Sequence, residues 1–141
     1  MSTAIETYQA LTTGCEEIRN TDPQSLASME VRDEWRQGDL RIIRLPDDFG
    51  TRFAAELEPA KPAEQLAPGN TQGSRHCLST LAGVEFYQLK GATALDGPVI
   101  EAKESFAITH PEHGDCVDCP PGWYAFPGQR AFAEEIQRVV D

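Results

Sequence analysis

The feature that most restricts the fold is a change of hydrophobic period near residue 36. Before it, an apolar residue recurs at steps of three or four, which predicts one stripe of a helix over the first twenty residues, formed by Ile5, Tyr8, Leu11, Cys15 and Ile18. After it, short runs of β-forming residues alternate with glycine and proline, which is typical of strands joined by turns. These runs predict strands at residues 40–45, 77–81, 83–89, 99–103, 104–109 and 123–126. We therefore expect a mainly β fold, a small barrel or sandwich, with an N-terminal helical extension.

The same change of period suggests how the chain is organised. Residues 1–35 are predicted to form a helical N-terminal arm, and residues 36–141 a β-rich domain. Within the arm, a second short helix is expected after Pro23, with Leu26 and Met29 on its inner face. The stretch from residue 46 to residue 73 is rich in proline and glycine and is predicted to be mostly loop. We expect the arm and this loop to be the contact surfaces for a partner.

The charge balance excludes some classes of partner. The chain has 23 acidic and 12 basic residues, for a formal net charge of −11. Binding to a nucleic-acid backbone requires clustered Lys and Arg, so the prediction is no nucleic acid. No apolar run approaches the length of a spanning helix, so no membrane role is predicted, and the first twenty residues lack the charge pattern of a signal peptide. A cytoplasmic protein with a protein partner is expected.

Histidine and cysteine side chains gather in two short stretches. One contains His76, and residues 110–119 read H-x2-H-x2-C-x2-C. Zinc binds about four nitrogen or sulfur ligands in a tetrahedron, and this spacing is compatible with such a site. The candidate metal ligands are His76, His110, His113, Cys116 and Cys119. A zinc ion bound there would join the β-hairpins and supplement a modest core.

The spacing leaves other interpretations open. Cys116 and Cys119 could instead form a disulfide, or be free thiols with surface histidines in a turn. If residues 116–119 form a regular strand, side chains three apart point to opposite faces, which disfavours a shared metal ion. Were the metal catalytic, Glu112 could serve as an acid or base on a bound water.

Several stretches of the chain resemble a group of small uncharacterised bacterial proteins. They are residues 36–39 (RQGD), 73–76 (GSRH), 109–113 (THPEH) and 121–124 (PGWY). Proteins of that group have R-Q-G-D, G-H-x-H, H-x-E-H and P-G-x-Y motifs and no established activity. The resemblance implies that the first 35 residues are an addition to a β core, and that His76, His110 and His113 form a histidine-based site. This chain departs from the pattern at Ser74, where the group has the first histidine of G-H-x-H.

Two functions remain open from the sequence. The first is a small acidic protein-binding or accessory module, in which a metal held by the histidines and cysteines is structural. The alternative is a metal-dependent enzyme with a cupin-like histidine site. A structural metal predicts stoichiometric, slowly exchanging zinc, whereas a catalytic metal predicts an open coordination position.

Overall fold

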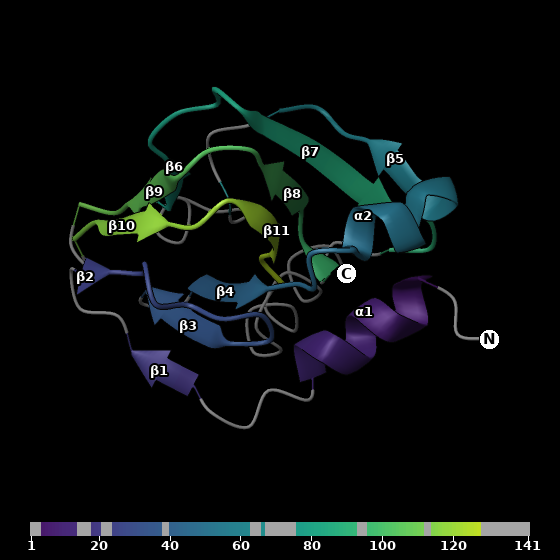
Figure 1. Ribbon diagram of the computed structural model, residues 1–141, viewed down its shortest axis with the longest axis horizontal. Helices are drawn as coiled ribbons and strands as arrows, with labels where there is room; N and C mark the ends of the chain where they lie inside the picture. The colour runs from purple at the N-terminus through teal and green to yellow at the C-terminus, as the bar shows by residue number, and fades with distance from the viewer. Residues whose placement is uncertain are drawn as a thin grey trace, which may run out of the picture.

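The protein is built mainly from short β-strands arranged in two sheets (Figure 1). The computed structural model describes residues 4–13, 18–20, 24–37, 40–62, 66, 76–92, 96–111 and 114–127. The prediction of a mainly β fold with a short N-terminal helix is confirmed. Within these ranges the two sheets share one core, which corresponds to the sandwich rather than to a closed barrel.

The strands of each sheet are mostly antiparallel. Among the described residues, the larger sheet has seven strands in the order β1 (Ile18–Asn20), β3 (Glu34–Gln37), β4 (Leu40–Arg44), β11 (Gly122–Ala125), β8 (Val99–Ala102), β7 (Val84–Leu89) and β5 (Leu57–Pro59). The smaller sheet has the order β2 (Gln24–Ser25), β10 (Cys116–Cys119), β9 (Phe106–Thr109) and β6 (Cys77–Leu78). Parallel pairing occurs at one edge of each sheet, between β1 and β3 and between β2 and β10.

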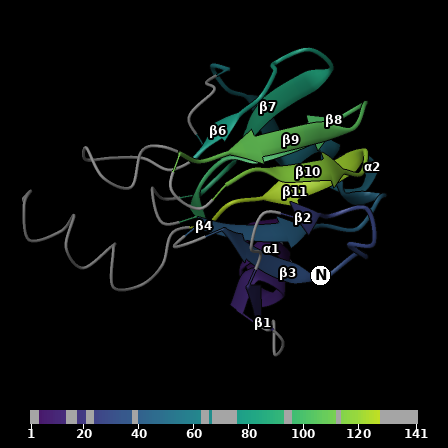
Figure 2. The same ribbon diagram turned by 90° about the vertical axis from the view of Figure 1, so that its left-hand side faces the viewer.

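The main core lies between the two sheets. Figure 2 shows β6, β9 and β10 side by side in the smaller sheet, whose inner face meets the larger sheet. Alternation along β7 follows from the pleat of a strand: Phe86 enters this core, whereas Tyr87 and Leu89 face the other way. The largest contributors from both sheets are Trp35, Ile42, Phe86, Ile100, Phe106, Ile108, Tyr124 and Phe126.

Two helices cover the outer face of the larger sheet. They are α1 (Ala4–Thr13) and α2 (Phe49–Arg52), which is followed by the 3₁₀ turn η1 (Ala54–Glu56), and both helices lie on the same side of the molecule in Figure 1. Tyr8 of α1 and Phe49 of α2 are fully buried against Ile43, Leu89 and other residues of the sheet. Because the larger sheet is covered on both faces, the adjacent residues Ile42 and Ile43 of β4 are both buried, Ile42 in the core between the sheets and Ile43 beneath the helices.

Of the described residues among the first 35, only those of α1 are helical. The helix predicted over the first twenty residues exists as α1, but its predicted end is wrong because Ile18–Asn20 form the edge strand β1. Gln24–Ser25 form the edge strand β2, so the prediction of a second short helix after Pro23 is also wrong. Leu26 and Met29 are nevertheless buried, as expected, in the core between the sheets. The described part of this segment therefore contributes to the core of the fold.

Candidate functional site

Two histidines face each other across neighbouring strands of the smaller sheet. The antiparallel register of β6 and β9 pairs Cys77 with Thr109 and Leu78 with Ile108, so His76 and His110 are the next opposing pair. Their ring centroids are 4.4 Å apart. His76 is 0% exposed and His110 6% exposed, because both follow the inward-facing alternation of their strands. The structure thus brings together two imidazoles that are 34 residues apart in the sequence.

Gln37 connects the two sheets at this histidine pair. It is the last residue of β3 in the larger sheet, and it is fully buried. Its amide Nε2 donates hydrogen bonds to the carbonyl oxygens of Ile108, at 2.9 Å, and Gly114, at 2.7 Å. Its Oε1 lies 2.8 Å from Nδ1 of His76. These contacts give hydrogen-bond partners to the buried amide of Gln37. Without them, burying its polar atoms would cost free energy.

A tight turn joins His110 to the strand that carries the cysteines. The Gly114 N–H donates to the His110 carbonyl oxygen at 3.0 Å, which closes the turn between β9 and β10. Gly114 has a φ of +77°, a conformation that glycine adopts without steric cost. Glu112 and His113 lie outside the described residues.

A bulge in β10 turns both of its cysteines inward. Cys116 pairs with Ile108 and Cys119 with Phe106, so three steps along β10 match two steps along β9. Asp118 absorbs the extra residue with a φ of +57°. Cys116 and Cys119 are both buried, whereas Val117 between them is exposed. The expectation that side chains three apart would point to opposite faces is therefore wrong for this strand.

The register separates Cys119 from the histidine pair. Cys116 is diagonal to His110 on the inner face, but Cys119 lies opposite Phe106, four residues before His110 along β9. Four residues of extended strand span about 13 Å, which is too far for Cys119 and His110 to share one metal ion. No disulfide joins Cys116 and Cys119, so that alternative is not observed.

The environment of Cys119 is that of a protonated core thiol. Its Sγ–H donates to the Cys116 carbonyl oxygen at 3.9 Å. Burial, followed by the neighbouring Cys116, raises the pKa of the Cys119 thiol to about 12. Cys119 therefore packs as a small apolar residue in the core between the sheets.

A metal ion would need more than the two histidines. Among the residues with described positions, no group of three or more His, Cys, Asp or Glu side chains is arranged to hold a metal ion. His76 and His110 converge as predicted, and the position of His113 is not described. None of the described helices has the length and apolar character needed to cross a membrane.

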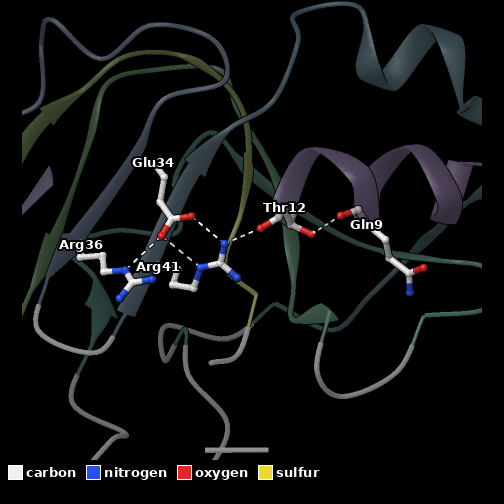
Figure 3. Close-up of polar contacts among 5 residues, drawn as sticks. All are labelled: Gln9, Thr12, Glu34, Arg36 and Arg41. Carbon is white, nitrogen blue, oxygen red and sulfur yellow. Dashed lines mark hydrogen bonds and ion pairs between the residues drawn. The ribbon is translucent and has the colours of Figure 1, made fainter. Parts of the chain in front are cut away.

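A second buried polar cluster lies on the opposite face of β3. Glu34, whose side chain is 0% exposed, accepts hydrogen bonds from Arg41, at 2.6 and 3.1 Å, and from Arg36, at 3.0 Å. Figure 3 shows that Arg41 also reaches the Thr12 carbonyl oxygen at the end of α1. The i, i+2 spacing of Glu34 and Arg36 is the sequence signal for this face, but that spacing alone does not reveal that the carboxylate is buried.

Burial and ion pairing act in opposite directions on the Glu34 carboxyl. Burial opposes ionisation, but hydrogen bonds from Arg41 and Arg36, together with their positive charges, outweigh it. The pKa of Glu34 is consequently held below its ordinary value of 4.5. The carboxylate is thus ionised at neutral pH and fastens the end of α1, through Arg41, to the β3–β4 hairpin.

A family model described as a domain of unknown function (DUF8820) matches residues 36–129. The chain belongs to this family. No curated protein and no solved structure matches the sequence. Within DUF8820, the matched residues include Gln37, His76 and His110, so the whole histidine site lies inside the family's domain. The match agrees with the expectation of an uncharacterised family, and it begins after the N-terminal segment that supplies α1, β1 and β2.

Proposed function

We propose that the protein is a small accessory module whose fold is held by a structural transition-metal ion. The observation that carries this proposal is the buried pair of imidazoles, His76 and His110, with ring centroids 4.4 Å apart. Histidine nitrogen is a preferred ligand of zinc, and adjacent strands of a sheet are a stable frame for two such ligands.

His113 is the proposed third ligand. It comes three residues after His110 in the sequence, and the resemblance to proteins with an H-x-E-H motif also groups it with His76. Cys116 is the proposed fourth, since it is diagonal to His110 on the same face. Cys119 is left out of the set because of its distance along β9.

The burial of the histidines favours a structural ion over a catalytic one. A catalytic zinc keeps one position open to water or substrate, whereas a structural zinc is enclosed by protein ligands. Imidazoles that are 0% and 6% exposed offer no surface on which a substrate could approach. This contrast supports the accessory module over the cupin-like enzyme.

We expect the metal-free protein to bind one equivalent of Zn²⁺ and to become more stable. At free Zn²⁺ 100-fold above its dissociation constant, the gain in the free energy of unfolding is about 2.7 kcal/mol. Isothermal titration and thermal melting measure both quantities. His76→Ala and His110→Ala should each abolish the stabilisation, and His113→Ala and Cys116→Ala test the other two ligands.

The matched control for these variants is Cys77→Ser. Cys77 is next to His76 in the chain but points to the opposite face of β6, where it is partly exposed. The Cys77→Ser variant should bind Zn²⁺ as the wild type does. Wild-type protein that binds no Zn²⁺, or that binds equally well without His76 and His110, would exclude the metal site.

We further propose that the partner of the module is a protein with a basic surface. A net charge of −11 attracts positively charged partners over distances up to about 10 Å at 0.1 M salt. The association rate measured by stopped flow should therefore fall as salt is raised from 0.05 to about 0.5 M. An association rate that does not change with salt would contradict this choice of partner.

A further inference from the structure

We propose that Gln37 is a positioning residue that fixes the tautomer of His76 and makes Nε2 its metal-binding atom. The role of the metal rests on the proposed function above, whereas the choice of tautomer rests on hydrogen bonding alone. The inference therefore says how the site is prepared for a ligand before any ligand binds.

The orientation of the Gln37 amide is set by two carbonyl groups. Nε2 carries two hydrogens and has two carbonyl acceptors within 3 Å, those of Ile108 and Gly114. Rotating the amide by 180° would place Oε1 against both carbonyl oxygens, leaving three acceptors facing one another without a hydrogen. Oε1 must therefore be the atom that faces His76.

The amide orientation determines which nitrogen of His76 carries hydrogen. An amide oxygen can only accept, so Nδ1 of His76, 2.8 Å away, has to donate. In the neutral ring the hydrogen is then on Nδ1, and Nε2 has the lone pair. Metal-binding histidines commonly donate their second N–H to a carbonyl or carboxylate in this manner, which fixes the ring and increases its basicity.

Gln37 also contributes to the contact between the two sheets, in addition to fixing the tautomer of His76. Gln37 belongs to the larger sheet, whereas Ile108 and His76 belong to the smaller sheet and the segment leading into it. Loss of its amide would both free the His76 ring to change tautomer and remove hydrogen bonds between the sheets. A test must therefore separate positioning from general stability.

The chemical class of ligand follows from the atom presented. A neutral imidazole nitrogen suits Zn²⁺, Cu²⁺, Ni²⁺ and Co²⁺, whereas Mg²⁺ and Ca²⁺ require oxygen ligands. We infer that the site selects these first-row transition ions over Mg²⁺ and Ca²⁺. Mg²⁺ at millimolar concentration should leave the His76 resonances unchanged, and equimolar Zn²⁺ should shift Nε2 more than Nδ1.

The deciding experiment is long-range ¹H–¹⁵N correlation NMR of the ¹⁵N-labelled, metal-free full chain above pH 8. Wild type is expected to show His76 with hydrogen on Nδ1 and an unprotonated Nε2. Gln37→Met removes the acceptor and should give a mixture of the two tautomers, together with Zn²⁺ binding weakened about 10- to 100-fold. Gln37→Glu keeps an oxygen at His76 and should keep hydrogen on Nδ1, but its second carboxylate oxygen would face the Ile108 and Gly114 carbonyl oxygens, so this variant should be less stable than the wild type.

The outcomes separate this inference from the proposed function. His76 of the wild type with its hydrogen on Nε2 would overturn the role of Gln37, even if Zn²⁺ binds. Hydrogen on Nδ1 with no response to Zn²⁺ would support the tautomer, overturn the ligand assignment and refute the proposed metal site. The wild-type spectrum decides the tautomer, so the inference is tested even if a Gln37 variant fails to fold.

Discussion

Gly97→Ala is expected to lower the free energy of unfolding by about 4 kcal/mol, near the upper end of single-substitution effects. Gly97 has a φ of +67°, and a Cβ at this position would lie 1.9 Å from the Phe126 carbonyl oxygen. Since the obstacle is backbone, no side-chain rotation can relieve the contact. The backbone would have to move where β8 pairs with β11, at Val99 and Ala125, in the middle of the larger sheet.

Gly83→Ala is a matched control for this effect. Gly83 has a similar φ of +72°, but the nearest atom to an added Cβ is the flexible Glu104 side chain, at 3.5 Å. Its cost should be only that of the left-handed conformation, about 1 kcal/mol. Urea denaturation measures the free energy of unfolding of both variants. Equal losses in the two variants would show that the contact between an added Cβ at position 97 and the Phe126 carbonyl oxygen does not contribute to the cost.

Glu34→Ala is expected to destabilise the protein by about 3 kcal/mol, because removing one partner of a buried ion pair leaves the other charge uncompensated. The side chain of Arg41 is only 16% exposed, and it would lose its carboxylate partner while still contacting Thr12. We expect hydrogen exchange to increase first in α1, since Arg41 holds the end of that helix. Exchange that increases equally in every element would contradict this link.

The contribution of Glu34 should also depend on pH in a defined direction. Its pKa is lower in the folded chain than its ordinary value of 4.5, so the stabilisation is complete well above pH 4.5. It is lost as the pH falls below 4.5 through the folded-state pKa, because protonation removes the ionic interaction with Arg41 and Arg36. The difference in unfolding free energy between wild type and Glu34→Gln should accordingly narrow in acid.

An exposed ion pair provides the comparison for Glu34. Glu85 and Lys103 are 3.1 Å apart, but their side chains are 49% and 59% exposed, so water already solvates both charges. Glu85→Ala should leave the melting temperature close to that of the wild type. A loss as large as that of Glu34→Ala would show that burial is not what distinguishes the two carboxylates.

The apolar pattern was sufficient to predict most of the strands and one helix. Residues 40–45, 83–89 and 99–103 were predicted as strands and correspond to β4, β7 and β8. The stripe of Ile5, Tyr8 and Leu11 predicted α1, because an amphipathic helix shows its buried face in its own spacing. The strands at residues 18–20, 24–25, 34–37, 57–59 and 116–119 were missed, since short edge strands and short polar strands lack such a pattern.

The candidate site was predicted in part. His76 and His110 were expected to converge, and they do. Gln37 was not singled out, because nothing in a glutamine's sequence neighbours indicates that it will be buried against a histidine. The orientation of Cys116 and Cys119 was misjudged because the bulge at Asp118 cannot be recognised from the spacing alone.

The sequence by itself determined the strand-forming segments, the amphipathic face of α1, the acidic charge and the types of side chain available for a site. These properties depend on residues close together in the chain, so local periodicity and composition express them. Only the tertiary structure decided that His76 lies opposite His110, that Gln37 reaches them from the other sheet, and that Cys119 lies apart. Those contacts depend on strand register and on how the two sheets pack, which are set by the burial of many distant side chains together.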